Sequence, residues 1–378
     1  MADNFDSLPI IEFQDAFSQD TKPRFLSELK HALVKTGFFY LKNHPISAGV
    51  QEELLQRSAA FFNLSPAQKQ EIDIANSKSF RGYTTLGGER TAAKVDERET
   101  FFVGFEAPMA NPELPIWYNL MGPNQWPRES LVPGFRESVE RYMAEADTLS
   151  DIFTGFVAEA LDMDPSVFAN FFQKPRMNST KLSAYPPPPD ISHDTQTEFQ
   201  GVGPHKDGSF LTYLLQGTEH TSLEVQNKSG EWIPVPPIPG TLVINIGRSL
   251  EAITKGVCVA TTHRVNLTRE QYSPSDKGPL GTRLSIPFFQ LFSLDVAPGN
   301  IDLDIPAHIV SIRDKNVKSD AETFFEGLHN KTFGEAFMMN ALTSHPEVGK
   351  RWYPEELADA LRKQQEAKVL DDEGKRQA

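Results

Sequence analysis

The spacing of apolar residues changes along the chain. Between residues 133 and 161 they recur at intervals of three and four, which predicts one long amphipathic helix. Beyond the proline run at 186–189 they gather into short runs separated by glycine, proline, asparagine and serine, a pattern typical of strands and turns. Few helix-length segments separate these runs, so the pattern favours a jelly roll over a parallel sheet. The predicted strands span 211–215, 223–226, 232–235, 241–246, 257–265 and 283–291.

The two ends of the chain carry helical spacing. In the first third, runs at 8–13 and 38–41 predict short strands, while the segments after Pro23 and Ser47 predict helices. From about residue 306 the spacing is helical again. The sequence therefore predicts a mostly β protein with flanking helices. Its predicted regions are an N-terminal mixed α/β region at 1–130, scaffold helices at 131–176, a jelly-roll core at 177–296 and a C-terminal helical extension at 297–378.

Composition narrows the class of protein and of partner. Of the 378 residues, 39% are hydrophobic and 23% are charged, which is ordinary for a folded globular protein. The net charge of −14 repels polyanions, so we expect no nucleic-acid or membrane partner, and no obligate protein partner is evident. Cys258 is the only cysteine, and the first residues show no targeting pattern. We therefore expect a cytoplasmic protein.

Three side chains form a candidate metal site. His205 and Asp207 are two positions apart in GPHKDGSF, so in a strand they face the same side, and His263 follows in TTHRV. Two imidazoles and one carboxylate, with the other positions open, are the ligand set of non-haem Fe(II) oxygenases. A lone His-x-Asp pair is more often a surface ion pair. The other histidines have no comparable partners and are interpreted as structural or exposed: His31, His44, His193, His220, His308, His329 and His345.

A second pair strengthens this interpretation. Arg283 and Ser285 are also two positions apart, in GTRLSIPFF, within the last predicted strand. A guanidinium presents a planar fork to a carboxylate, and a hydroxyl adds one directed hydrogen bond. The pair comes after the candidate metal ligands in the same β-rich region. It is therefore suited to bind the far carboxylate of a dicarboxylic acid that chelates iron.

These motifs resemble the 2-oxoglutarate- and Fe(II)-dependent dioxygenases of the isopenicillin N synthase type, over most of the chain. Segments at 8–13, 36–46, 61–69 and 81–89 are similar to that family's N-terminal region in the same order. DERETFFVGFE at 96–106 resembles the strand that closes one side of its active site, and KLSAYPPPP resembles its Asn-Tyr-Tyr-Pro-Pro segment. HKD, TTHRV and RLS match its iron and 2-oxoglutarate motifs.

The resemblance implies a fold, an activity and roles for residues. The fold is a distorted double-stranded β-helix, or jelly roll, with a helical N-terminal region and a helical C-terminal lid. The activity is hydroxylation, desaturation or cyclisation of a small organic substrate, with Fe(II), O2 and 2-oxoglutarate, releasing succinate and CO2. Because members of this family often act in secondary metabolism, the resemblance also implies such a pathway. His205, Asp207 and His263 are the catalytic iron ligands. Arg283, Ser285, Tyr185 and Ser183 are the 2-oxoglutarate residues, with Ser183 in the asparagine position.

The chain departs from the family pattern in three places. Arg248 stands where many relatives carry aspartate, Ser222 where glycine is usual, and the loop at 268–282 is long. Arg248 is an alternative contact for an acidic substrate group. For an apolar substrate pocket the candidates are Phe101, Phe105, Tyr213 and Phe289, although each also suits ordinary core packing.

Two other functions remain open at this point. One is an Fe(II) oxidase of the same fold that does not use 2-oxoglutarate and turns its Arg-x-Ser pair to a substrate carboxylate. The other is an inactive metal-binding scaffold, which an intact ligand set disfavours. Consumption of 2-oxoglutarate distinguishes the first alternative from the dioxygenase.

Overall fold

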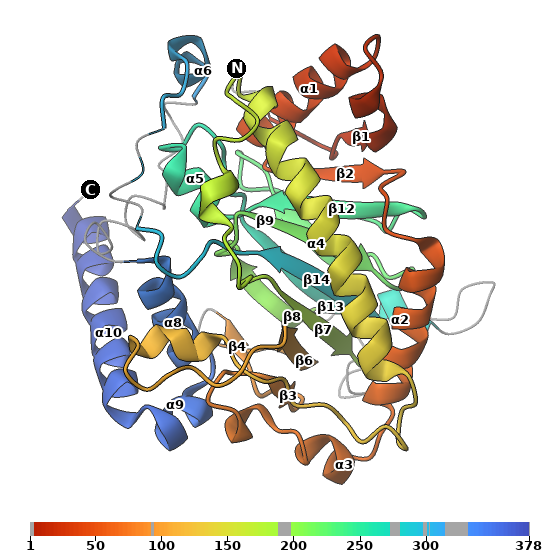
Figure 1. The fold of residues 1–378 in the computed structure, drawn as a ribbon, viewed down its shortest axis with the longest axis vertical. Helices are drawn as coiled ribbons and strands as arrows, with labels where there is room; N and C mark the ends of the chain where they lie inside the picture. Colours follow the sequence, from red (N-terminus) through yellow and green to blue (C-terminus); the bar gives the residue numbers. More distant parts are fainter. Residues whose placement is uncertain are drawn as a thin grey trace.

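Two β-sheets form the centre of the molecule in the computed structural model (Figure 1). The structure describes residues 4–91, 94–187, 198–272, 280–297, 301, 303–313 and 332–377, with backbone only for 367–377. The larger sheet has eight strands, in the order β1-β2-β12-β9-β14-β7-β6-β3. These strands are β1 (Ile10–Glu12), β2 (Phe38–Lys42), β12 (Thr241–Ile246), β9 (Leu211–Gln216), β14 (Arg283–Gln290), β7 (Ser179–Tyr185), β6 (Glu99–Gly104) and β3 (Gly82–Thr84).

The smaller sheet has four strands, in the order β11-β10-β13-β8. They are β11 (Trp232–Pro234), β10 (Leu223–Gln226), β13 (His263–Thr268) and β8 (Glu198–His205), and all their pairings are antiparallel. A separate hairpin consists of β4 (Arg90–Thr91) and β5 (Lys94–Val95). The two sheets are the halves of a distorted jelly roll, which confirms the fold class predicted from the sequence.

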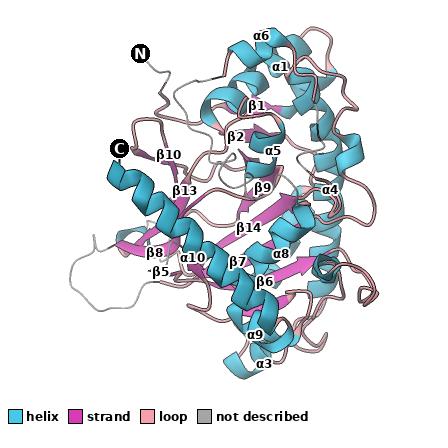
Figure 2. Cartoon of the chain, turned by 90° about the vertical axis from the view of Figure 1, so that its left-hand side faces the viewer, coloured by secondary structure: helices cyan, strands magenta, loops and turns pink. Residues whose placement is uncertain are grey.

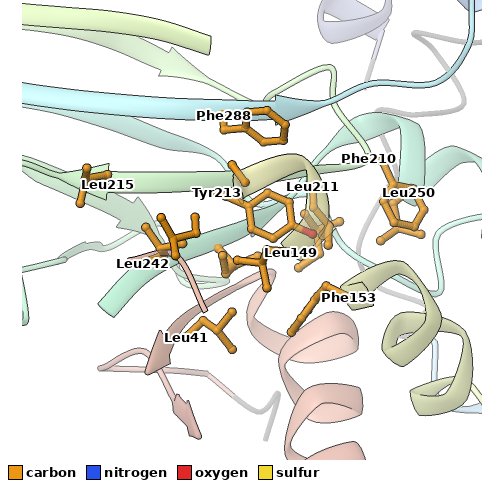
Figure 3. Close-up of a cluster of buried hydrophobic side chains, with 14 of the residues drawn as sticks. Leu41, Leu149, Phe153, Phe210, Leu211, Tyr213, Leu215, Leu242, Leu250 and Phe288 are labelled. Carbon is orange, nitrogen blue, oxygen red and sulfur yellow. The ribbon is translucent and has the colours of Figure 1, made fainter. Parts of the chain in front are cut away.

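The N-terminal helices and α4 pack on one face of the larger sheet (Figure 1). Leu149 and Phe153 of α4 meet Tyr213 and Phe288 of the sheet in a buried apolar cluster (Figure 3). The predicted helix at 133–161 is confirmed as α4. The helices of this half of the chain are α1 (Lys22–His31), α2 (Ala48–Phe62), α3 (Pro66–Gln70) and α4 (Phe135–Ala160).

One strand prediction was wrong in its boundaries. The apolar run at 257–265 predicts a strand over its whole length, but the strand is His263–Thr268. The preceding residues are buried against the N-terminal region instead, where the Val259 amide donates to Leu33 O and Thr261 Oγ1 donates to Thr36 O. Gly37 permits this approach, since a Cβ there would lie 2.2 Å from Thr261 Oγ1. Strands β7 and β8 were not predicted.

Helices α8 (Phe333–Ser344), α9 (Pro346–Trp352) and α10 (Pro354–Gln377) form a layer beside the open end of the jelly roll (Figure 2). Helix α9 is anchored to the segment before β3: Trp352 Nε1 donates to Ala75 O at 3.0 Å, and the Tyr353 hydroxyl donates to Lys78 O at 2.7 Å. The Tyr353 ring also stacks on Phe80, with centroids 5.9 Å apart. Two shorter helices lie outside this layer: α5 (Arg248–Ile253), between β12 and β13, and α6 (Ala307–Ser311), after β14 (Figure 1).

Some features noted in the sequence lie outside the described residues. These are His193, His329 and residues 273–279 of the long loop at 268–282. Among the residues that are described, no helix is both long and apolar enough to cross a bilayer.

Candidate active site

A cavity of about 640 Å³ opens between the two sheets. Alternate residues of β14 and β7 line it: Arg283, Ser285, Pro287 and Phe289 from the first, and Ser179, Lys181 and Tyr185 from the second. His205 and His263 enter from the smaller sheet. Residues of α8, among them Phe337 and Asn340, and Gln364 of α10 complete the wall. Helices α8 and α10 are therefore part of the cavity wall and form its lid.

The three candidate metal ligands meet in this cavity. His205 and His263 lie directly opposite each other on β8 and β13, and their ring centroids are 4.2 Å apart. Asp207 lies just past the end of β8. Its Oδ1 is 3.5 Å from His205 Nε2 and 3.7 Å from His263 Nε2. One potential ligand atom from each residue lies within 4.8 Å of the others, which suits a single metal ion.

Backbone carbonyls orient both imidazoles. His205 Nδ1 donates to Gly203 O at 2.8 Å, and His263 Nδ1 donates to Thr261 O at 3.3 Å. With the proton on Nδ1, the lone pair of each Nε2 faces Asp207 and is available to a metal. Burial and the neighbouring His205 lower the pKa of His263 to about 4, although Asp207 opposes this shift. His263 is therefore neutral near pH 7, as a ligand must be.

Asp207 is held as an oriented anion. Its Oδ2 accepts hydrogen bonds from Thr212 Oγ1 at 2.6 Å and from Asn245 Nδ2 at 2.8 Å. Thr212 and Asn245 are cross-strand neighbours on β9 and β12, so the larger sheet supplies both donors. Burial alone would raise the pKa of Asp207, but the two histidines and the Thr212 hydroxyl lower it well below its usual range. Oδ1 stays charged and directed at the imidazoles.

The four candidate 2-oxoglutarate residues form two cross-strand pairs. Arg283 lies opposite Tyr185, and Ser285 lies opposite Ser183, on the adjacent strands β14 and β7. Arg283 is 1% exposed, and its guanidinium lies 4.6 Å from the centre of the Tyr185 ring. Within the described part of the chain, its Nη1 and Nη2 are buried without a hydrogen-bond partner. Such a buried fork is suited to a carboxylate. Ser183 is buried but does not line the cavity.

The aromatic candidates for the substrate pocket occupy different places. Phe289 lines the cavity on the same face of β14 as Arg283. Phe101 and Tyr213 are fully buried in the core on the other face of the larger sheet, and Figure 3 shows Tyr213 beside Phe153. Phe105 packs against that core and does not line the cavity. Phe102, the neighbour of Phe101, lines it instead.

Sequence reasoning missed several residues of the site. Thr212 and Asn245 carry no motif, and only the pairing of β9 with β12 brings them to Asp207. Phe102 was missed because its position depends on the register of β6 against β7: it pairs with Lys181, which shares a strand face with Tyr185. The contribution of α8 has no local signal, since a helix can cover either end of a jelly roll.

A buried charge cluster borders the cavity on the side of β6 and β7. Glu89 accepts hydrogen bonds from Thr100 Oγ1 at 2.8 Å, from Lys181 Nζ at 3.0 Å and from Arg98 Nη2. Burial alone would raise the pKa of Glu89, but Arg98 and Lys181 lower it well below its usual range. Glu89 therefore offsets one of the two positive charges, and Asp96, 3.6 Å from the Arg98 guanidinium, is a second carboxylate beside them.

Family comparisons agree with this geometry. Residues 166–291 match the 2OG-Fe(II) oxygenase superfamily, and residues 8–129 match the family described as "non-haem dioxygenase in morphine synthesis N-terminal". The chain belongs to the 2-oxoglutarate- and Fe(II)-dependent dioxygenases, and it is an enzyme that uses Fe(II), 2-oxoglutarate and O2.

Similar proteins include fungal and bacterial ones. A 2-oxoglutarate-dependent dioxygenase of Gibberella zeae is 44% identical over 99% of this chain and 98% of its own length. Clavatol oxidase claD of Penicillium crustosum is 30% identical over 81% of this chain and 89% of its own length. Among solved structures, a full-length Neurospora crassa protein in complex with alpha-KG superposes with a TM-score of 0.67 at 22% identity, over 85% of this chain and 95% of that one. A putative 2OG-Fe(II) oxygenase family protein of Caulobacter crescentus gives 0.65 at 26% identity, over 84% and 97%.

Proposed function

We propose that His205, Asp207 and His263 bind the catalytic Fe(II), and that Arg283, Ser285 and Tyr185 hold the far carboxylate of 2-oxoglutarate. One observation carries the proposal: the unpartnered guanidinium nitrogens of Arg283, among the described residues, are buried in the same cavity as the three clustered ligand atoms. An unpaired buried charge is costly, so the cavity is suited to an anion at that position. Ser183 supports this group from the neighbouring strand, where it lies opposite Ser285.

The substrate is a small organic molecule bound between the sheets and the lid. When bound, the iron would use 2-oxoglutarate and O2 to supply an oxidant that removes hydrogen from the substrate, with release of succinate and CO2. The chain contributes positioning: Asn245 and Thr212 fix Asp207, and Arg283 fixes the co-substrate. Hydroxylation, desaturation and cyclisation are all compatible with this arrangement. The direct test is succinate formation from 2-oxoglutarate by the Fe(II)-loaded protein, with and without a panel of substrates.

The cellular setting is a further part of the proposal. The net charge of −14 and the single cysteine support a cytoplasmic enzyme that acts without nucleic acid, a membrane surface or an obligate protein partner. A role in secondary metabolism is supported by the relative named clavatol oxidase. The proposed functional regions of the chain are 1–130, 131–176, 177–296 and 297–378.

The support of Asp207 by Asn245 gives a prediction for metal affinity. Asn245→Ala removes one of the two donors to Asp207 Oδ2, so the carboxylate loses part of its orientation. We expect Fe(II) affinity to fall by about 10- to 100-fold, measured by anaerobic titration. Asn119→Ala is the matched control, because that amide donates to the Ile116 carbonyl within a short 3-10 helix (Ile116–Leu120) and Asn119 does not line the cavity. Equal metal affinity in both variants would contradict the role of Asn245.

The contacts that anchor the end of α9 give a prediction for the coupling of 2-oxoglutarate consumption to product formation. Tyr353→Ala removes both the hydrogen bond to Lys78 and the stacking on Phe80, a residue that lines the cavity. Because a loosened lid admits water, more 2-oxoglutarate should be consumed per molecule of product, by several-fold. The measurement is the ratio of succinate to product, with Lys363→Ala on α10 as the control. An unchanged ratio in folded Tyr353→Ala protein would mean that these helices only buttress the barrel.

A further inference from the structure

Arg81 is a buried cation that the reaction described above does not use. It lies immediately before β3, is 4% exposed and lines the cavity. Its Nη2 donates to the Leu120 carbonyl at 3.0 Å, while Nε is buried without a hydrogen-bond partner among the described residues. No described carboxylate lies within ion-pair distance of this guanidinium, in contrast to Arg98 just before the neighbouring strand β6.

Packing holds the Arg81 guanidinium in place. It lies over the ring of Phe102, 4.8 Å from the centroid, and Phe102 also lines the cavity. On another side it contacts the backbone of Gly104, where an added Cβ would come within 2.4 Å of Nη2. The side chain therefore has little freedom to move to solvent, and its charge is fixed at the cavity wall.

Glu106, the carboxylate whose charge affects Arg81, forms its hydrogen bonds with other residues. Glu106 attracts Arg81 over a longer distance, but its carboxylate accepts hydrogen bonds from Trp126 Nε1 at 2.8 Å and from the Asn124 amide at 3.2 Å. Burial lowers the pKa of Arg81 to about 10, with Glu106 opposing the shift, so the guanidinium remains protonated at neutral pH. A buried charge of this kind is costly without a counter-ion.

The cavity as a whole has an excess of positive charge. Seven arginine and lysine side chains line it among the described residues, but only two carboxylates, Glu89 and Asp207. Glu89 pairs with Arg98 and Lys181, and Asp207 is assigned to the metal. Two carboxylates outside the lining also offset lining cations: Asp96 lies 3.6 Å from Arg98, and Glu251 lies 4.0 Å from Lys206. The two charges of Fe(II) balance those of 2-oxoglutarate, so the excess remains when both are bound. This excess favours an anionic substrate in a chain that is otherwise acidic.

We propose that Arg81 binds a carboxylate of the organic substrate, and that the substrate is therefore a small carboxylic acid. Ser79 supplies a second donor, since its Oγ is also buried without a partner in the described structure and it lines the same cavity. The inference rests on the proposed function, because Arg283 must be occupied by 2-oxoglutarate for Arg81 to select the substrate.

The test compares acids with their amides on the full chain. Acetate, hexanoate, benzoate and phenylacetate, each beside its primary amide, are titrated calorimetrically into anaerobic Fe(II) protein saturated with 2-oxoglutarate. At least one acid should bind about thirtyfold or more tightly than its amide, because the amide cannot form the buried charge pair with Arg81 and loses about that much affinity. If no acid binds more tightly than its amide, the inference is overturned.

Variants test whether the preference for acids over amides arises from Arg81. Arg81→Gln should abolish the preference for acids, Arg81→Lys should keep part of it, and Ser79→Ala should weaken it. Arg128→Gln, which removes an exposed arginine paired with Glu71, is the control and should keep it. A preference that persists in Arg81→Gln, or in Arg81→Ala if the glutamine variant does not fold, refutes the assignment. Failure of the wild-type protein to bind 2-oxoglutarate in the same cell would instead refute the proposed function.

Discussion

Replacing His205, Asp207 or His263 by alanine should abolish turnover and sharply reduce Fe(II) affinity while the protein stays folded. Each supplies one of three clustered ligand atoms, and a metal site with one ligand removed loses both affinity and geometry. The fold should survive because the largest hydrophobic cluster lies on the other face of the larger sheet, around Tyr213 (Figure 3). Succinate formation, metal titration and thermal unfolding measure the three properties separately.

The matched control for these variants is His308→Ala. His308 is a surface histidine on α6 whose Nε2 bonds Asp162, so the change removes an imidazole and an ion pair without touching the cavity. It should retain turnover and metal affinity. Wild-type activity in any single ligand variant would contradict the assignment of that residue.

Arg283→Gln should raise the concentration of 2-oxoglutarate needed for turnover by roughly a hundredfold to a few thousandfold. The reason is that a buried carboxylate loses its guanidinium, which typically costs ~3–5 kcal/mol. Ser285→Ala should have the same effect more weakly, by about 1–3 kcal/mol, because it removes one hydrogen bond. Fe(II) affinity should change little in both variants, since neither residue is in the ligand cluster.

Arg264→Gln is the control for Arg283. Arg264 follows His263 on β13 and pairs with Glu224 over the Trp232 ring, so it belongs to the smaller sheet and does not line the cavity. Its loss should leave the 2-oxoglutarate requirement near the wild-type value. If Arg283→Gln and Arg264→Gln behaved alike, Arg283 would not hold the co-substrate.

The sequence predicted those parts of the fold whose signals are local. The long helix α4 follows from its apolar stripe, and β12 and β14 follow from short runs between turn residues. The run at 257–265 misled because burial, not strand pairing, explains its apolar character: Val259 and Thr261 pack on Leu33, Thr36 and Gly37.

The residues of the site also divide into those that a local sequence signal predicts and those that it does not. Two-residue spacing was enough to predict that Arg283 and Ser285 share a face, and that His205 lies near Asp207. The choice between Phe101 and Phe102 needed the register of β6 against β7, which no sequence motif encodes. Arg81 lies in the segment at 81–89 that resembles the family. Its place in the cavity wall could not be predicted, because the contacts with Phe102 and Gly104 that fix its guanidinium form only in the folded chain.

The most direct test of the account is an anaerobic titration of the Fe(II)-loaded protein with 2-oxoglutarate, followed by visible absorption. A keto acid chelated to iron gives a weak charge-transfer band. We expect the band to appear in the wild-type protein, to need much more 2-oxoglutarate in Arg283→Gln, and to be absent in His205→Ala, Asp207→Ala and His263→Ala. If wild-type protein bound Fe(II) but showed no band, made no succinate with any substrate, and Arg283→Gln weakened only substrate binding, the enzyme would be an oxidase that does not use 2-oxoglutarate.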